Sequence, residues 1–281
     1  MNWIFNKNII LSGASSGIGK ALATILITKY NCHIMGLART ESKLEAFKQE
    51  LGDKGNLFDY YAMDVGISEN WEKLRDHLVE ISFKPDILIN NAGTMTPFES
   101  FEHISEEQTN RVMRTNFLSV TYAVRDLLPL LQESKTPAII NISSASALGC
   151  LPGVSIYSAS KSALKSFSEI LHAEQRGKVY VATILPGFVK TNLFTNKDNS
   201  RDIINQKDKK IIDRFSMRAD KMAKKIIRTI KRKRARAVIG ADAKFLNICY
   251  KLSPQASGKM MGNIMKISKM DTFEDVYKKE K

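Results

Sequence analysis

The feature that most constrains the fold is an alternation of short apolar runs with longer segments of helical periodicity. The first apolar run, residues 8–11, ends in a glycine-rich turn, and residues 20–29 then repeat Leu22, Ile25 and Leu26 at helical spacing. Further strands are predicted at 33–38, 57–63, 87–90, 137–143, 179–185 and 236–239, and further helices at 41–51, 68–81, 105–117, 119–131, 157–175 and 220–230. This repeated strand–helix–strand order predicts a parallel sheet with right-handed crossovers.

The composition and the strand pattern together predict one globular domain. Strands such as residues 138–142 are apolar almost throughout, as strands covered by helices on both faces must be. With 43% hydrophobic and 26% charged residues, the chain is neither disordered nor fibrous. We predict an α/β fold, a doubly wound parallel sheet over residues 1–240. Within it, the polar residues 190–219 form a mobile flap over the substrate, and residues 241–281 follow as a C-terminal extension or tail.

The cysteines and histidines indicate neither a disulfide framework nor a metal site. Cys32, Cys150 and Cys249 are far apart and form no Cys-x-x-Cys pair, and the four histidines have no metal-ligand spacing. The first residues contain too short an apolar stretch for a signal peptide. We therefore expect a cytoplasmic protein that binds no metal.

The net charge of +14 is concentrated in one segment. Residues 197–236 carry 16 Lys and Arg against five Asp, a net charge of +11, so the other residues are nearly balanced. Three interpretations stay open: a solvated basic face with the tail packed on the body or on a partner subunit, peripheral attachment to an anionic membrane, and nucleic-acid binding, which is the least favoured. The apolar residues of the tail are too interrupted for a membrane span.

The glycine-rich turn lies between the first strand and the first helix. Gly13, Gly17 and Gly19 surround Ser15, Ser16 and Ile18. Small residues at such a turn let backbone N–H groups and the helix N-terminus approach a pyrophosphate. A turn required only for tight packing is the alternative, but the strand–turn–helix context favours a dinucleotide site of the Rossmann type.

A second feature concerns the ribose end of that dinucleotide. About 20 residues after the glycine turn, such folds place an acidic residue that accepts from the ribose 2′-hydroxyl. This chain has Ala38 and Arg39 there, and a guanidinium can pair bidentately with a 2′-phosphate. The sequence thus favours NADP(H) over NAD(H), with a solvated arginine as the alternative. Asp64 and Val65 follow the third strand, where they could meet the adenine or cap the next turn.

Tyr157 and Lys161 lie four residues apart and so share one face of a helix. A nearby cation favours phenolate, which predicts a lowered tyrosine pKa and a general acid/base. Ser144 ends the preceding apolar strand, at the sheet edge where α/β proteins gather their chemistry.

With these residues in place, the sequence resembles the short-chain dehydrogenase/reductase family over about residues 6–240. The motifs that carry the resemblance, in order, are Ser12-Gly-Ala-Ser-Ser-Gly-Ile-Gly19, Asp64-Val65, Asn90-Asn-Ala-Gly93, Asn116, Ser144, Tyr157-x-x-x-Lys161, and Pro186-Gly187 followed by Thr191. The family usually has Thr where Ser12 stands, a substitution that keeps the hydroxyl.

The resemblance implies a role for each matching position. Tyr157 would exchange a proton with the substrate oxygen, Lys161 would lower its pKa and bind the nicotinamide ribose, and Ser144 would orient the substrate. Asn116 would hold a helix bend and a water near Lys161. The other cofactor-binding positions would be Asn91, Ala92 and Gly93 on the adenosine side and Pro186, Gly187, Val189 and Thr191 at the carboxamide. The family also implies a homodimer or homotetramer formed through the helices at 105–131 and 157–175.

The residues expected around the substrate are mostly apolar. Besides Ser144 they are Met95, Leu148, Cys150, Val154, Phe188, Leu193 and Phe194, with Phe215 and Met217 from the flap. Such a pocket suits a lipophilic carbonyl or secondary alcohol. We therefore expect an NADP(H)-dependent oxidoreductase; the alternative is a membrane- or nucleic-acid-associated binding or sensor protein that keeps the fold and uses the cofactor structurally.

Overall fold

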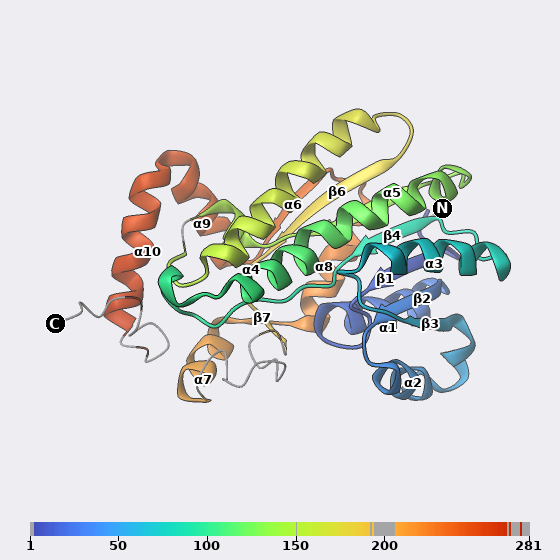
Figure 1. Ribbon diagram of the computed structural model, residues 1–281, viewed down its shortest axis with the longest axis horizontal. Helices are drawn as coiled ribbons and strands as arrows, with labels where there is room; N and C mark the ends of the chain where they lie inside the picture. The colour runs from blue at the N-terminus through green and yellow to red at the C-terminus, as the bar shows by residue number, and fades with distance from the viewer. Residues whose placement is uncertain are drawn as a thin grey trace.

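The structure is a computed structural model that describes residues 3–149, 151–191, 193, 206–268, 270 and 276, without the side chains of residues 206, 207, 209 and 215. Its centre is a seven-stranded, entirely parallel sheet in the order β3-β2-β1-β4-β5-β6-β9 (Figure 1). The strands are β1 (Asn8–Ser12), β2 (His33–Ala38), β3 (Phe58–Ala62), β4 (Ile87–Asn90), β5 (Ala138–Ile142), β6 (Tyr180–Pro186) and β9 (Arg236–Ile239). The predicted doubly wound α/β sheet is therefore confirmed.

Helices cover both faces of the sheet, which explains why its strands are apolar on both sides. On one face α1 (Gly17–Tyr30), α2 (Glu41–Glu50) and α8 (Ala219–Lys231) enclose a core that includes Ile9 and Leu11. On the other, α3 (Ser68–Glu80), α5 (Ser119–Gln132) and α6 (Ser155–Glu174) enclose a second core that includes Ile10. Successive strand residues point to opposite faces, so neighbouring isoleucines of β1 enter different cores.

The two helices predicted at 105–117 and 119–131 form one bent helix. It consists of α4 (Glu106–Met113), a π-helical turn η3 (Arg114–Leu118) and α5. Ser105 caps its start, since its hydroxyl accepts from Gln108 N while the Gln108 side chain accepts from Ser105 N. π-Helical turns interrupt the regular ladder and often mark functional positions.

The chain after β6 forms more regular structure than the sequence predicts. The predicted flap contains β7 (Val189–Lys190) paired in parallel with β8 (Met217–Arg218), and α7 (Gln206–Phe215) lies between them; residues 192 and 194–205 lie outside the described part. The predicted tail contains α9 (Ala241–Leu252) and α10 (Pro254–Ser268), with Pro254 at the first position of α10. Short 3₁₀ turns complete the chain: η1 (Gly52–Leu57), η2 (Phe101–His103) and η4 (Ala145–Leu148).

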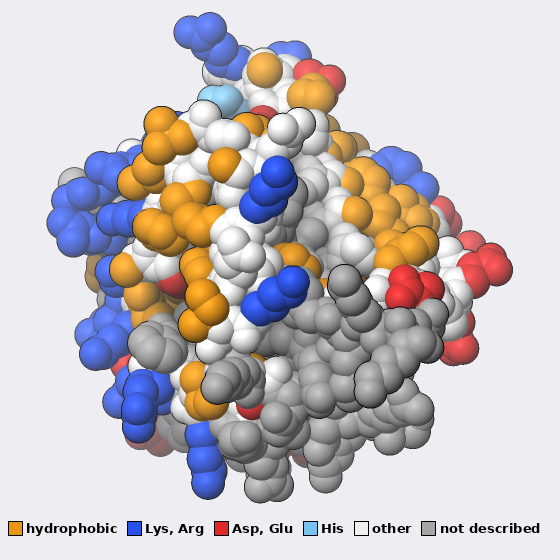
Figure 2. Space-filling model, turned by 90° about the vertical axis from the view of Figure 1, so that its left-hand side faces the viewer, with side chains coloured by type: hydrophobic (Ala, Val, Ile, Leu, Met, Phe, Trp, Pro, Cys, Tyr) orange, Lys and Arg blue, Asp and Glu red, His pale blue; other side chains and the backbone are white. Residues whose placement is uncertain are grey.

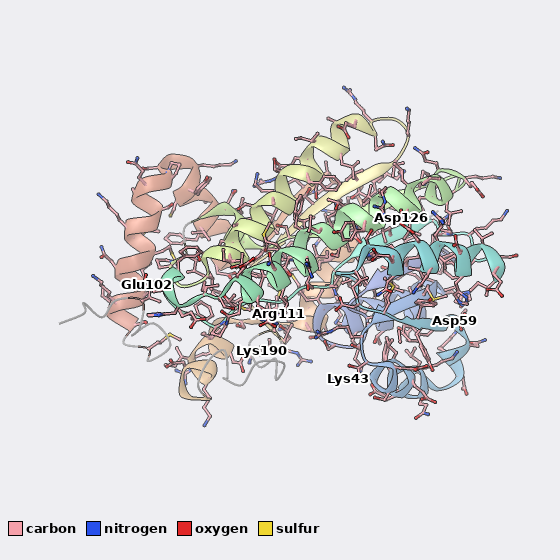
Figure 3. The ribbon with its side chains drawn as sticks, viewed as in Figure 1. Lys43, Asp59, Glu102, Arg111, Asp126 and Lys190 are labelled. Carbon is pink, nitrogen blue, oxygen red and sulfur yellow. The ribbon has the colours of Figure 1, made fainter. Side chains whose placement is uncertain are left out.

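The two ends of the strands differ in what surrounds them. At the carboxyl ends, α9 and α10 pack beside the loops that follow β5 and β6, at the left of Figure 1. At the amino ends, Trp3 Nε1 donates to Lys231 O, and the Lys233 ammonium lies 5.1 Å from the Trp3 ring centroid. In Figure 3, Asp59 near the start of β3 lies to the right of Lys190, which is on β7 after the end of β6.

Candidate active site

One cavity of about 380 Å³ lies at the carboxyl ends of the central strands. Its wall comes from four regions: the glycine turn, the loops after β4, β5 and β6, the start of α6, and the C-terminal helices. Of the residues predicted to bind cofactor or substrate, the following line it: Gly13, Ser16, Gly17, Ile18, Asn91, Ala92, Gly93, Met95, Ser144, Val154, Tyr157, Lys161, Pro186, Gly187, Phe188, Val189, Thr191 and Leu193. Folding thus brings into one space residues as far apart in the chain as Gly13 and Leu193.

The glycine turn requires glycine at each of its three positions. Gly13 and Gly17 have φ values of 68° and 53°, in the left-handed region that favours glycine. A Cβ on Gly13 would lie 2.9 Å from Asn91 Nδ2, and one on Gly19 would lie 2.1 Å from Gly13 O. Gly19 and Ser15 belong to the turn but do not line the cavity. The exposed Ser16 and the first residues of α1 do line it.

Ser12 fastens the turn to the neighbouring strand, a role that the sequence did not reveal. Its Oγ accepts from the backbone N–H groups of Asn91 and Ala92, both at 3.0 Å. Asn91 Nδ2 in return donates to Ser12 O at 3.0 Å and to Gly13 O at 3.3 Å. The hydroxyl, which Ser and Thr share, is the group that this position needs.

Asn116 lies behind the cavity wall, fully buried in the π-helical turn. Its Oδ1 accepts from Thr94 N and its Nδ2 donates to Thr94 O, each at 2.8 Å, and Nδ2 also donates to Ser160 Oγ at 2.9 Å. A Cβ on Gly93 would lie 3.4 Å from both Asn116 Oδ1 and Lys161 Nζ. A π-helical turn interrupts the helix at Asn116, and the Asn116 amide and the Lys161 ammonium both lie beside Gly93.

Ser144, Tyr157 and Lys161 all line the cavity. The Tyr157 hydroxyl is hydrogen-bonded to the Ser144 side chain. Lys161 Nζ donates to Ile142 O at 3.0 Å, and Ser143 Oγ donates to Lys161 O at 2.8 Å. The end of β5 and the first turns of α6 are thereby joined at the level of the tyrosine.

The protonation of these groups differs from the sequence prediction in one respect. Burial raises the pKa of Tyr157 above its ordinary value of 10, against the opposing effect of the Ser144 hydrogen bond. The predicted lowering of this pKa by Lys161 is therefore not seen. Burial lowers the pKa of Lys161 itself from 10.5 to about 8, because a charged ammonium is disfavoured away from water.

Arg39, Asp64 and Val65, predicted at the ribose and the adenine, lie outside this cavity. Arg39 is exposed directly after β2. Asp64 Oδ1 accepts from Gly66 N at 2.8 Å, so the carboxylate caps the turn before α3. Val65 is buried, and its carbonyl accepts from Trp71 Nε1 at 2.8 Å. The structure shows the turn-capping alternative for Asp64.

The substrate end of the cavity is largely apolar. Phe98, Leu151, Phe245, Leu246, Met261 and Ile264 extend the apolar wall beyond the residues predicted from the sequence. Leu148 does not line the cavity, because it packs in the core against Leu185. Met217 also lies outside the wall, and Cys150, Phe194 and the Phe215 side chain lie outside the described residues.

Asp242, the second residue of α9, is the main site residue that sequence reasoning missed. Its Oδ2 accepts from Phe188 N at 2.6 Å, and it lines the cavity. A Cβ on Gly187 would lie 2.1 Å from the same oxygen. Gly187 N also donates to Ile239 O at 2.8 Å, so β9 and α9 together hold the loop after β6. No local signal in the sequence links Asp242 to a residue 54 positions earlier.

Comparison with known proteins decides the family. Residues 7–202 match the family model described as short chain dehydrogenase. The chain belongs to the short-chain dehydrogenase/reductase family. The 11-beta-hydroxysteroid dehydrogenase 1A of Arabidopsis thaliana is 34% identical over 210 residues, which are 72% of this chain and 59% of that protein, so the match spans less than two thirds of the relative.

Two further members of the short-chain dehydrogenase/reductase family are similar over comparable or longer stretches. The NADPH-dependent pterin aldehyde reductase of Arabidopsis thaliana is 32% identical over 190 residues, 68% of this chain and 78% of that protein. The structure of L-sorbose reductase from Gluconobacter frateurii, complexed with NADPH and L-sorbose, is 25% identical with a TM-score of 0.75 and covers 87% of this chain and 99% of that one. Both proteins are named as reductases, and NADPH appears in the name of the first and in the structure of the second.

The described residues were expected to hold neither a metal site nor a membrane span. Among them, no group of three or more His, Cys, Asp or Glu side chains is arranged to hold a metal ion. No helix in the described ranges is both long and apolar enough to cross a membrane.

Proposed function

We propose that this protein is an NADP(H)-dependent oxidoreductase that interconverts a lipophilic carbonyl compound and the corresponding secondary alcohol, with Tyr157 as the general acid/base. The proposal rests on the hydrogen bond between Tyr157 and Ser144, which line the same cavity as Lys161. That cavity runs from the glycine turn to an apolar wall. The hydroxysteroid dehydrogenase and NADPH-dependent reductase among the relatives support it.

The cavity fits a nicotinamide dinucleotide. Gly13 and Gly17 line the cavity where a pyrophosphate would bind, and Gly93 lines it beside the Lys161 ammonium. The Pro186–Thr191 segment would hold the nicotinamide carboxamide. The bound dinucleotide supplies the hydride, with its electron pair, that reduces the carbonyl carbon.

The protein supplies the proton. The Tyr157 phenol holds its proton at neutral pH, because burial raises its pKa above the ordinary value of a tyrosine. It donates that proton to the substrate oxygen in the reductive direction, while the Ser144 hydroxyl donates a hydrogen bond to the same oxygen. Lys161, which is mostly protonated at pH 7 with a pKa of about 8, stabilises the phenolate that remains. In the oxidative direction Tyr157 takes the proton back.

The cofactor preference and the assembly are part of the same proposal. The exposed Arg39 after β2 would pair with the 2′-phosphate of NADP(H). The protein would act in the cytoplasm as a homodimer or homotetramer built through α5 and α6, where Ile170 exposes an apolar side chain to solvent.

Substitution of Tyr157 tests the mechanism. Tyr157→Phe keeps the ring but removes the proton donor, so we expect a loss of NADPH-dependent reduction on the order of 100-fold or more across a panel of lipophilic ketones and aldehydes. NADPH binding, measured by calorimetry, should survive. Undiminished turnover in the variant would refute the role of Tyr157.

A further inference from the structure

The helices α9 and α10 expose an unusual amount of apolar surface. In α9, Phe245, Ile248 and Leu252 share one face at helical spacing, and Leu252 is 82% exposed. In α10, Ile264 and Ile267 lie three residues apart, and Ile267 is 78% exposed. We call these five side chains the apolar surface of α9–α10.

The charges on the two helices have one sign. Four exposed lysines, Lys244, Lys251, Lys259 and Lys266, lie among the apolar residues. The one acidic residue between 241 and 268 is Asp242, whose carboxylate accepts from Phe188 N at the cavity instead of neutralising a lysine. Figure 2 looks onto this end of the molecule, where hydrophobic and basic side chains are interspersed and acidic ones gather at the right-hand margin.

The apolar surface continues into the cavity. Phe245 and Ile264 both line the cavity wall, yet 52% of Phe245 and 46% of Ile264 remain exposed to solvent. Met265, one residue after Ile264, packs inward against Met95 and Phe98. The same two helices therefore form a wall of the substrate end and the surface around it.

The most basic stretch of the chain lies elsewhere. Lys231 and Lys233 contact Tyr30 and Trp3, and Arg234 O accepts from Tyr180 at the first residue of β6. These contacts are at the amino ends of the strands, whereas the cavity is at the carboxyl ends. The basic residues 231–234 and the mouth of the cavity are thus on opposite edges of the sheet.

We propose that α9–α10 dock this protein on the surface of an anionic membrane, with the apolar surface in contact with the lipid and the four lysines at the headgroups. Such a helix pair suits the interface of a bilayer. Its apolar residues are exposed, its exposed charged side chains are lysines, and the helices are interrupted at Ser253 and Pro254. A lipophilic substrate would then pass from the bilayer into the cavity between Phe245 and Ile264. That last step rests on the proposed function; the docking does not.

Co-sedimentation of the full-length protein with vesicles tests the docking directly. We expect binding to vesicles of phosphatidylcholine containing phosphatidylserine, and much weaker binding to phosphatidylcholine alone. Raising the salt from about 0.1 M to about 1 M should weaken it, because the Debye length falls from about 10 Å to about 3 Å. Replacing Lys244, Lys251, Lys259 and Lys266 with Gln should reduce partitioning by roughly 600-fold, since each lysine near an anionic surface contributes about fivefold.

Matched variants separate this surface from general charge and hydrophobicity. The charge control replaces four exposed cations of the basic segment, Lys221, Lys225, Arg228 and Arg232, with Gln, and should bind vesicles nearly as well as the parent. The apolar pair Leu252→Asp and Ile267→Asp should abolish binding, whereas Val79→Asp and Ile81→Asp, at exposed positions at the end of α3, should not. All of these positions are exposed, so the fold should survive, which circular dichroism and NADPH binding would check.

Three results would overturn the docking proposal. Equal losses in the α9–α10 and control variants would show that no particular surface is used. Binding to phosphatidylcholine alone that matches binding to anionic vesicles would remove the role of the lysines. Self-association of the parent that Leu252→Asp abolishes, in a protein that does not bind vesicles, would identify a second copy of this chain as the occupant.

Discussion

Replacing Asp242 tests whether the C-terminal extension positions the cofactor loop. The Asp242 carboxylate accepts the Phe188 N–H at 2.6 Å and lies against Gly187, in the segment assigned to the nicotinamide carboxamide. A hydrogen bond to a charged group contributes about 1.5–3 kcal/mol, and the lower value applies to a carboxylate that is only partly buried. Asp242→Ala should therefore lower the equilibrium constant for ordering of the loop by about tenfold.

Cofactor binding reports this loss of order. When only a fraction of the protein is competent to bind, the apparent dissociation constant rises by the inverse of that fraction, so NADPH should bind up to about tenfold more weakly to Asp242→Ala. Asp242→Asn keeps an acceptor oxygen and should lose roughly threefold, because the neutral hydrogen bond is weaker. The turnover number at saturating NADPH should change much less, since Ser144, Tyr157 and Lys161 remain in place. Calorimetry and steady-state kinetics measure the two quantities.

Asp220 provides a matched control. It is the second residue of α8, as Asp242 is of α9, and each follows an alanine at the first helical position. Asp220→Ala removes the same favourable charge from a helix N-terminus, but Asp220 pairs with Arg218 and lies outside the cavity wall. It should lower stability slightly and leave NADPH binding unchanged. Equal effects of the two substitutions on NADPH affinity would refute a positioning role for Asp242.

Gly187 permits a further test by a double-mutant cycle. A Cβ at Gly187 would lie 2.1 Å from Asp242 Oδ2, so Gly187→Ala should displace the carboxylate and weaken NADPH binding by itself. If the two residues act through one contact, the double variant should bind no more weakly than the worse single variant. Additive losses would show that the two positions act independently.

Two other predictions concern the remaining charges of the site. Lys161→Met should abolish activity, yet it should stabilise the fold by up to about 3 kcal/mol below pH 8. The reason is that the pKa of the lysine falls from 10.5 in the unfolded chain to about 8 in the folded protein, and a shift of one pKa unit corresponds to about 1.4 kcal/mol. Between pH 8 and 10.5 the unfolded parent binds more protons than the folded parent, so the stability of the parent rises with pH. The stability advantage of the variant therefore shrinks over this range, and denaturant titrations at pH 7 and pH 10 would detect the change. Arg39→Ala should weaken NADPH binding by about tenfold and NADH binding hardly at all, as expected for the loss of a charged hydrogen bond; equal losses for the two cofactors would show that Arg39 does not read the 2′-phosphate.

The fold could be predicted from the sequence because its signals are local. Continuous apolar strands such as β5 alternate with helices of 3.6-residue periodicity, and β2, β4 and β9 begin and end at the predicted residues. The bend at Asn116 was assigned through the family resemblance, but its form, a π-helical turn within one long helix, needed the structure. Helix boundaries shifted by a few residues, because end residues are decided by capping contacts.

The site was predictable where its residues form a short motif. Gly13, Gly17 and Gly19 act through the backbone of their own turn, and Tyr157 and Lys161 share a helix face, so spacing alone locates them. The pKa of Tyr157 was predicted in the wrong direction, since spacing shows a nearby lysine and says nothing of burial. Ser12 was noticed for its hydroxyl, but its partners Asn91 and Ala92 depend on strand pairing.

By itself, then, the sequence determined the parallel α/β fold and the family, and it pointed to the reacting groups that we propose. The tertiary structure decided which distant segments share the cavity: it brought Asp242 to Phe188, placed α9 and α10 at the substrate end, and put the basic residues 231–234 at the opposite edge of the sheet. Periodicity and motif spacing follow from interactions over a few residues. The order of strands in a sheet sets distances between residues far apart in the chain, and it exists only once the cores on both faces have formed.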